Sequence, residues 1–109
     1  MGLGRLDPRF APYAEALVQA ADAAGLRPQI TSTFRSIGRQ RALWEARQRG
    51  EHPLPVAYPG CSYHNYGLAF DMVCDDLPWA GALWQSWGGV WGGAGDPVHF
   101  QVPGPRLCH

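Results

Sequence analysis

The chain has 109 residues, of which 46% are hydrophobic and 17% are charged, and its formal net charge at pH 7 is zero. This size and composition predict a single globular domain over residues 1–109 with one modest hydrophobic core. A net charge of zero, without a run of like charges, argues against binding to nucleic acid or to a membrane surface by bulk electrostatics. No apolar segment approaches the roughly 20 residues that a transmembrane helix needs.

The first residues, Met-Gly-Leu-Gly-Arg-Leu-Asp-Pro, lack the apolar core and cleavage site of a secretory signal peptide. We therefore expect synthesis in the cytoplasm without a signal peptide. The three cysteines are Cys61, Cys74 and Cys108. An odd number at irregular spacing is not typical of a disulfide framework, so one disulfide and three free thiols are both open.

Asp7 and Pro8 predict the start of a first helix, with Asp7 as its N-cap, and Gly25 ends it. The apolar residues of this helix recur at helical spacing: Phe10, Tyr13, Leu17, Ala20, Ala21 and Ala24.

A second helix is predicted from an N-cap at Ser36 to Gly50, and a third from an N-cap at Asp76. One face of the third helix carries large apolar residues: Trp79, Leu83 and Trp87. The tryptophans of the chain are expected to lie mostly in the core.

Three segments read as strands. Residues 29–34 alternate between faces, residues 68–73 are apolar and aromatic and suit a central strand, and residues 98–102 alternate again. Glycine pairs on both sides predict a break in the chain around Val90 and Trp91. Strands and helices interleave without βαβ regularity, which predicts an α+β fold with a small, mostly antiparallel sheet backed by helices.

Two segments carry chemistry. The stretch Cys-Ser-Tyr-His-Asn-Tyr-Gly-Leu-Ala-Phe-Asp, residues 61–71, holds His64 and Asp71, and the later stretch Asp-Pro-Val-His-Phe holds Asp96 and His99. Two histidines and a carboxylate are enough to bind a catalytic zinc, and the remaining carboxylate could act as general base. Taken singly, the first pair also fits a turn-capping aspartate and a solvated loop histidine, and the second pair fits an ordinary turn aspartate near a partly buried histidine.

Other residues leave two interpretations open. Arg35 ends a strand, where it could stabilise an oxyanion or form a surface ion pair, and Gln40 could orient Arg35 or be solvated. The spacing Cys61-x-x-His64 also fits a structural zinc site completed by Cys74 or Cys108. Aromatic residues expected near a cleft wall are Tyr63, Tyr66 and Trp91, and weak histidine candidates are His52 and His109.

The pattern Ser62-x-His64-x-x-Gly67-x-Ala69-x-Asp71 resembles the first zinc motif of the D-Ala-D-Ala carboxypeptidase and dipeptidase group of zinc peptidases. These enzymes share a core with lysostaphin-type peptidases and the hedgehog signalling domain. Asp96-x-x-His99 resembles the second zinc motif. The amino-acid sequence of residues 62–71 is more similar still to that of phage endolysins, the L-alanyl-D-glutamate peptidases that cut bacterial cell-wall stem peptides. The segments 35–40 and Trp-Gly-Gly at 91–93 also resemble that branch, and the likeness runs from about residue 6 to 101.

The resemblance implies a hedgehog/DD-peptidase-like fold, with His64, Asp71 and His99 as ligands of Zn²⁺. It implies Asp96 as the general base and Arg35 as the group that stabilises the tetrahedral intermediate. We further assign four residues to substrate binding: Ser62, Tyr63, Gln40 and Trp91. The chain departs from the family where Ala-Gly at 94–95 leads directly to the acid, and where a proline stands at position 97 rather than directly before the histidine.

The expected function is a zinc metallopeptidase that hydrolyses peptidoglycan stem peptides, first of all as an L-alanyl-D-glutamate endopeptidase. The alternatives are a D-alanyl-D-alanine carboxypeptidase or dipeptidase, and a non-catalytic hedgehog-like zinc module. The expected partner is bacterial peptidoglycan peptide. We expect the protein to act at the cell wall, which it reaches at lysis or by another route of export. The expected oligomeric state is a monomer.

Overall fold

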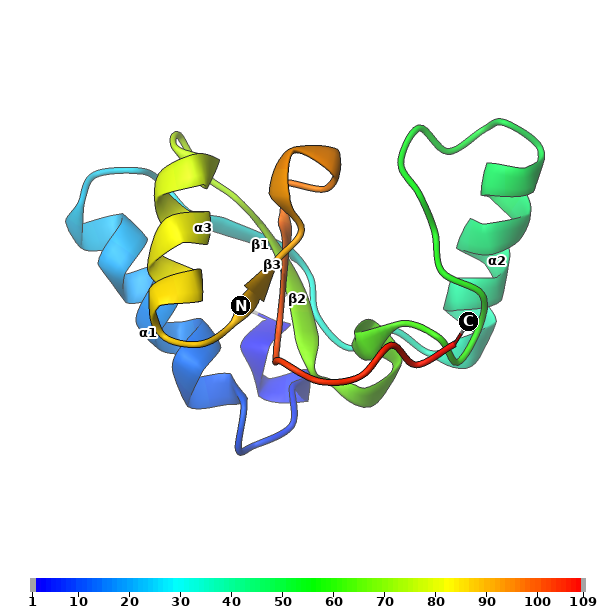
Figure 1. Ribbon diagram of the computed structural model, residues 1–109, viewed down its shortest axis with the longest axis horizontal. Helices are drawn as coiled ribbons and strands as arrows, with labels where there is room; N and C mark the ends of the chain where they lie inside the picture. Colours follow the sequence, from blue (N-terminus) through cyan, green and yellow to red (C-terminus); the bar gives the residue numbers. More distant parts are fainter. Residues whose placement is uncertain (1, 109) are drawn as a thin grey trace.

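The computed structural model describes residues 2–108 and has a four-stranded sheet with three α-helices (Figure 1). The strands lie in the order β1-β2-β4-β3, and every neighbouring pair is antiparallel. Their bounds are β1 Gln29–Ser32, β2 Ala69–Val73, β3 Val90–Trp91 and β4 His99–Gln101. The helices are α1 Ala11–Ala23, α2 Ile37–Gln48 and α3 Leu77–Ser86, with 3₁₀ turns η1 Gly2–Arg5, η2 Tyr63–Tyr66 and η3 Gly93–Gly95. This confirms the predicted α+β fold and the central position of β2.

The core lies between the sheet and the pair of helices α1 and α3, which stand together on one side of the sheet in Figure 1. Phe70 of β2 and Phe100 of β4 are fully buried and stack with ring centroids 5.3 Å apart. Trp84 of α3 meets the Phe70 ring edge-on at 5.5 Å. Such aromatic pairs each add about 0.5–1.5 kcal/mol beyond their buried area. Helix α2 lies across the sheet from α1 and α3, beside the face that carries the polar residues described below.

The first helix begins at Ala11, with Phe10 rather than Asp7 as its N-cap, three residues later than the sequence predicts. Asp7 instead organises the preceding turn, where its Oδ1 atom accepts a hydrogen bond from the backbone N–H of Arg9 at 2.8 Å. The buried stripe of α1 contains Ala14 and Leu17, whereas Tyr13 is 59% exposed, so the predicted face was wrong at Tyr13. A tyrosine at the edge of the stripe keeps its hydroxyl in water, and the small Ala14 takes the position against the sheet.

The predicted caps of the other helices are confirmed. The Ser36 hydroxyl accepts a hydrogen bond from the N–H of Arg39 at 3.1 Å, and Asp76 Oδ1 accepts one from the N–H of Trp79 at 3.0 Å. Each such cap stabilises a helix by about 1 kcal/mol.

The predicted face of α3 was wrong, because Trp79 and Trp87 are 38% and 41% exposed. The buried residues of α3 are Ala80, Gly81 and Trp84. Gly81 explains the difference, since a Cβ atom at this position would lie 2.2 Å from the indole of Trp91. Small residues on this face let α3 approach Trp91, and of the tryptophans only Trp84 is buried in the core.

Residues 90–91 form a strand, β3, rather than a break in the chain, and pair with residues 100–101 of β4. A two-residue strand between glycine pairs has no periodicity that a sequence pattern could reveal. None of the helices formed by residues 2–108 has the length and hydrophobicity needed to span a bilayer.

Candidate metal centre

The register between β2 and β4 brings two of the predicted ligands together. Asp71 and His99 are directly opposed across this antiparallel pair. Opposed residues project from the same face of a sheet, and their neighbours along the strand project from the other face. Phe70 and Phe100, the adjacent pair, point into the core. Asp71 and His99 therefore share the opposite face.

His64 reaches this face from the turn η2, just before β2. The Ser62 hydroxyl caps the turn by accepting a hydrogen bond from the His64 N–H at 3.2 Å, and the Asn65 side chain completes a capping box. Gly67 ends the turn with a φ of +70°, and a Cβ atom there would lie 2.9 Å from the backbone nitrogen of Asp7. Only glycine combines this backbone conformation with this close approach.

The ring of His64 is held in one orientation. It is 2% exposed, and its Nδ1 atom lies 2.7 Å from the carbonyl oxygen of Thr33. A carbonyl oxygen can only accept, so Nδ1 carries the proton and donates it. The other nitrogen, Nε2, faces Asp71 Oδ1 at 3.0 Å. A metal ion held at this point would bind Nε2, with Nδ1 already bonded to the protein as metal-ligating histidines require.

The ring of His99 is also held by a contact between one of its nitrogens and a protein oxygen, but here Nε2 makes this contact and Nδ1 faces Asp71. Its Nε2 atom lies 2.7 Å from Gln101 Oε1, and its Nδ1 atom lies 3.4 Å from Asp71 Oδ1. The three donor atoms of His64, Asp71 and His99 all lie within 4.8 Å of one another, so this group could hold a metal ion. Two imidazole nitrogens and one carboxylate oxygen, with the outer nitrogens bound to protein oxygens, form a donor set that fits Zn²⁺ and leaves a position open.

The group is charged before any metal binds. Burial opposes the charge on Asp71, but hydrogen bonds from His64 and His99 outweigh it and hold the pKa of this carboxyl well below its usual range. Burial also opposes the charge on His99, but hydrogen bonds with Asp71 and Gln101 outweigh it and raise the pKa of this imidazole. Metal binding would therefore compete with protonation of His99.

Arg35 lies beside Asp71 at the edge of the same cleft. Its guanidinium donates hydrogen bonds to Gln40 Oε1 at 3.0 Å and to Ser32 Oγ at 2.9 Å, and its Nη2 atom lies 3.5 Å from Asp71 Oδ2. Burial lowers the pKa of Arg35, and the charge of Asp71 opposes this shift. Gln40 is 1% exposed and also donates to the carbonyl oxygen of Ala57 at 2.7 Å. Gln40 thus ties Arg35 to α2 and to the loop over residues 51–60.

Asp96 lines a cleft of about 160 Å³ together with Arg35 and all three candidate ligands. Burial raises the pKa of Asp96; the charge of Asp71 acts in the same direction, and His99 acts against it. A carboxylate with a raised pKa is a stronger base than an ordinary aspartate, and such a group suits proton transfer.

The turn that carries Asp96 is held from behind by residues 91 and 92. The Trp91 indole donates a hydrogen bond to the carbonyl oxygen of Pro97 at 2.8 Å, and the N–H of Gly92 donates to the carbonyl oxygen of His99 at 2.9 Å. A Cβ atom on Gly92 would lie 2.2 Å from the carbonyl oxygen of Asp96. Trp91 lies behind this turn and is absent from the lining of the cleft, so its predicted contact with substrate stays a prediction.

The other residues predicted to bind substrate lie close to the cleft. Ser62 lines it, although its hydroxyl also caps η2. Tyr63 is buried, donates its hydroxyl to Pro105, and lines the neighbouring cavity rather than the cleft itself. Tyr66 is 52% exposed, donates to the carbonyl oxygen of Gly60, and is not among the residues that line the cleft.

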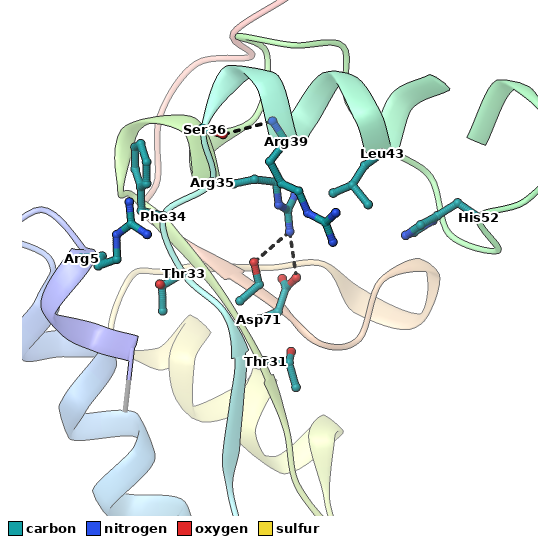
Figure 2. A pocket seen from close by; sticks show the side chains of 11 residues that line it. Arg5, Thr31, Thr33, Phe34, Arg35, Ser36, Arg39, Leu43, His52 and Asp71 are labelled. Carbon is teal, nitrogen blue, oxygen red and sulfur yellow. Dashed lines mark hydrogen bonds and ion pairs between the residues drawn. The ribbon is translucent and has the colours of Figure 1, made fainter. Parts of the chain in front are cut away.

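The cleft shares lining residues with two larger cavities, and we name the cleft and these two cavities together the trough. At its α2 end, a cavity of about 580 Å³ (Figure 2) shares Arg35, His52 and Asp71 with the cleft. Along the C-terminal segment, a cavity of about 500 Å³ shares Ser62 and His99 with the cleft. The candidate ligands therefore border both cavities. His52 lines the trough but does not belong to the ligand group, and His109 lies outside the described residues.

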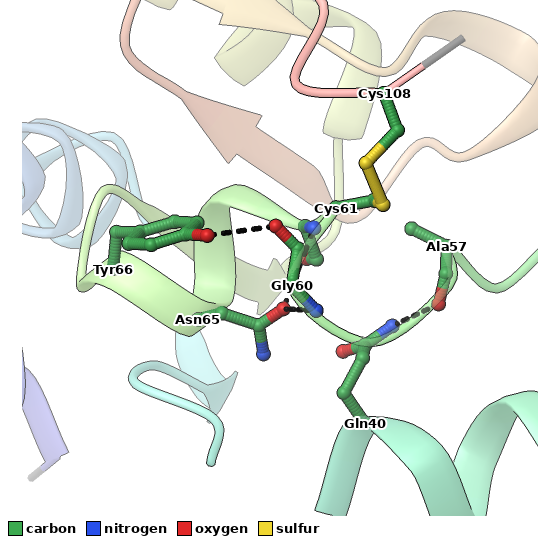
Figure 3. Close-up of a disulfide and its surroundings, with 8 residues drawn as sticks. Gln40, Ala57, Gly60, Cys61, Asn65, Tyr66 and Cys108 are labelled. Carbon is green, nitrogen blue, oxygen red and sulfur yellow. Dashed lines mark hydrogen bonds between the residues drawn. A yellow bond between two sulfur atoms is a disulfide. The ribbon is translucent and has the colours of Figure 1, made fainter. Parts of the chain in front are cut away.

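A disulfide joins Cys61 to Cys108, with the two Cα atoms 5.4 Å apart (Figure 3). Cys61 directly precedes Ser62, so the bond fastens the C-terminal segment to the turn that carries His64. The disulfide leaves neither cysteine a thiolate for a metal. The alternative of a structural zinc site on Cys61 and His64 is therefore wrong in this structure, and Cys74 is a free thiol.

Sequence reasoning did not identify Thr33 and Gln101, which orient the two histidines, or Ser32, which holds Arg35. A signal was available for Gln101, because a residue two positions after His99 on a strand projects from the same face. The carbonyl of Thr33 had no sequence signal, since any residue supplies a carbonyl group.

The sequence matches the protein-family model described as VanY, D-alanyl-D-alanine carboxypeptidase, over residues 4–87, which include Arg35, His64 and Asp71. A D-alanyl-D-alanine carboxypeptidase of Enterococcus faecalis (strain ATCC 700802 / V583) is 31% identical in an alignment of 86 residues, which covers 67% of this chain and 32% of that protein. The peptidoglycan L-alanyl-D-glutamate endopeptidase CwlK of Bacillus subtilis (strain 168) is 39% identical over 69 residues, or 62% of this chain and 41% of that protein. The chain thus spans about a third to two fifths of these relatives.

Solved structures share the fold. VanYB in complex with D-alanine-D-alanine superposes with a TM-score of 0.73 and 25% identity, over 91% of this chain and 72% of that one. The VanY E175A mutant in complex with Zn(II) gives a TM-score of 0.72 at 24% identity, over 91% and 73%. The match to the family model covers well over half of the residues. The chain belongs to the VanY D-alanyl-D-alanine carboxypeptidase family.

Proposed function

We propose that this chain is a zinc peptidase domain that hydrolyses the stem peptides of bacterial peptidoglycan, as an L-alanyl-D-glutamate endopeptidase. The observation that carries the proposal is the convergence of His64, Asp71 and His99 on one cleft that Arg35 and Asp96 also line. The relatives support the substrate class, since one is named as a carboxypeptidase for D-alanyl-D-alanine and the other as a peptidoglycan endopeptidase.

The ligand group would hold the metal through the inward nitrogens of the two histidines and through Asp71. Zn²⁺ bound there would supply a Lewis acid for the scissile carbonyl and would lower the pKa of water to about 7. Thr33 and Gln101 keep the two rings in the required tautomers, at 2.7 Å in each case.

Asp96 and Arg35 would carry out the remaining steps. Asp96 accepts a proton from the attacking water and returns it to the leaving amine, so the proton count balances. Arg35, already held by Ser32 and Gln40, donates hydrogen bonds to the carbonyl oxygen as negative charge develops on it. Because Gln40 is buried, the guanidinium needs little reorganisation during the reaction.

The trough favours an endopeptidase. An internal peptide bond requires room for substrate residues on both sides of the metal, and cavities of about 580 and 500 Å³ each share lining residues with the cleft. The 39% identity with the B. subtilis endopeptidase supports the same choice.

A D-alanyl-D-alanine carboxypeptidase is the second candidate, favoured by the family model and by the E. faecalis relative. It would use the same residues, and its substrate would fill a smaller part of the trough. A non-catalytic zinc module is disfavoured, because a binding module has no need for Asp96 and Arg35 in one cleft with the ligand group.

The test is digestion of purified peptidoglycan by the zinc-loaded protein, with mass spectrometry of the products and Asp96→Asn as control. New L-alanine C-termini on the glycan side would support the endopeptidase. Loss of one terminal D-alanine would instead identify a carboxypeptidase. Absence of products from a protein that binds zinc stoichiometrically would overturn the proposed peptidase.

The place of action and the oligomeric state belong to the same proposal. We expect action at the cell wall by a monomer. The disulfide between Cys61 and Cys108 fits an oxidising environment outside the cytoplasm, because cytosolic thiols are generally kept reduced. Light scattering after size-exclusion chromatography tests the monomer.

A further inference from the structure

The α2 end of the trough carries two arginines side by side. Figure 2 shows the Arg39 side chain extending from α2 toward the same space as the guanidinium of Arg35. Arg35 is committed to Ser32, Gln40 and Asp71. The guanidinium of Arg39 forms no ion pair with any carboxylate of the described residues 2–108.

The charge at this end of the trough is unbalanced. The lining includes three arginines and a single carboxylate, that of Asp71. Arg5 lies over the ring of Phe34, with its Cζ atom 5.0 Å from the ring centroid. Arg39 is close enough to Arg35 that its charge contributes to the lowered pKa of Arg35. If Asp71 binds a metal, it no longer balances the arginines, so the lining lacks an anion.

We propose that Arg39, with the positive charge of Arg35 beside it, binds a free carboxylate of the substrate residue next to the scissile bond. This inference rests on the proposed function and names the group that the α2 end of the trough recognises. A glutamyl residue has two carboxyl groups, and only one of them continues the peptide chain. The other therefore lies beside an L-alanyl-D-glutamate bond as a free anion. A guanidinium binds a carboxylate through two parallel hydrogen bonds, which a neutral amide cannot replace.

The experiment measures binding without turnover. Zinc-loaded Asp96→Asn protein is titrated by calorimetry with two synthetic stem peptides, which are identical except that the free glutamyl carboxylate of one is converted to an amide. We expect the acid to bind at least about tenfold more tightly, as is usual for a charge-assisted contact. Adding Arg39→Gln should remove this difference by weakening the binding of the acid.

Arg41→Gln is the matched control. Arg41 lies on the same exposed helix, and its substitution removes the same charge, but its guanidinium lies over the ring of Tyr58, at 6.0 Å from the centroid, and it does not line the trough. This variant should keep the preference for the acid. Circular dichroism and thermal unfolding establish that both variants fold.

Equal or undetectable binding of the two peptides by the parent protein would overturn the inference, as would a preference that survives Arg39→Gln. Hydrolysis is measured separately with Asp96 intact. Hydrolysis of both peptides at equal rates, with equal binding, would overturn the proposed carboxylate site but would still support the proposed function. A binding preference that depends on Arg39, without hydrolysis of either peptide, would support the carboxylate site and overturn the proposed function.

Discussion

The indole Nε1 atom of Trp91 donates a hydrogen bond to the carbonyl oxygen of Pro97 at 2.8 Å, one residue beyond Asp96. The turn η3 that leads to Asp96 has no buried residue of its own. Its position therefore depends on contacts from β3. Trp91 in turn packs against Gly81 of α3, so its side chain connects the turn of the proposed general base to the core.

Trp91→Phe should lower kcat by about tenfold or more while the zinc content stays unchanged. Phenylalanine keeps the ring against Gly81 but removes the hydrogen bond to Pro97, and small errors in the position of a catalytic group can cost up to about 10²-fold in rate. Steady-state kinetics and metal analysis test this. A kcat within twofold of the parent value would show that Trp91 does not position Asp96.

Gly92→Ala should destabilise the protein by about 1–3 kcal/mol and displace Asp96. The added methyl group would lie 2.2 Å from the carbonyl oxygen of Asp96, so the backbone has to move. Gly95→Ala is the control, because a Cβ atom at Gly95 has nothing within 4 Å. Urea unfolding of both variants measures the difference; equal stability would contradict the close packing at Gly92.

Gln40→Leu should lower both the free energy of unfolding and kcat. The change removes the hydrogen bond to the carbonyl oxygen of Ala57 and frees the guanidinium of Arg35. Each lost hydrogen bond of this kind costs about 0.5–1.5 kcal/mol. Gln48→Leu, at an exposed position on the same helix, provides the comparison. If the two variants unfold at the same urea concentration, the hydrogen bonds of Gln40 do not contribute to stability.

The stability of the metal-free protein should fall as the pH rises above about 6.5. The pKa of His99 is raised above its ordinary value of 6.5, so the protonated ring stabilises the folded state at lower pH. That contribution is lost as the pH rises through the folded pKa. Asp71 affects stability at acidic pH instead. Its pKa is depressed below 3.8, so the stabilisation by its charged form is lost only in strong acid.

Zinc should reverse this dependence, because metal binding requires His99 without its proton and zinc affinity therefore rises with pH. We expect the difference in Tm between zinc-loaded and chelator-treated protein to widen between about pH 6 and pH 8. Thermal scans at several pH values measure it. A constant difference over this range would show that no ligand proton is displaced by the metal.

Replacing both Cys61 and Cys108 by serine should destabilise the folded state by about 4 kcal/mol on the chain-entropy model, since the bond closes a loop with a sequence separation of 47. A reducing agent should lower the Tm of the parent protein and leave that of the double variant unchanged. An equal response of the two proteins would show that the bond is not formed in solution.

Features that depend only on neighbouring residues could be predicted from the sequence. The caps at Ser36 and Asp76 follow from side chains that reach a backbone N–H three residues away. The placement of Asp71 opposite to Phe70 follows from the period of a strand. The residue types of the ligand group, with the resemblance to zinc peptidases, pointed to the same chemistry as the family match.

The contacts between distant segments could not be predicted in this way and are known from the folded structure. The register that sets Asp71 opposite His99, the disulfide from Cys61 to Cys108, and the strand at 90–91 each join parts of the chain that no local pattern connects. The buried face of α3 was mistaken for the same reason, since its small residues are explained by Trp91. Local periodicity arises from the geometry of one backbone segment, whereas register and packing depend on side chains that meet only in the folded chain.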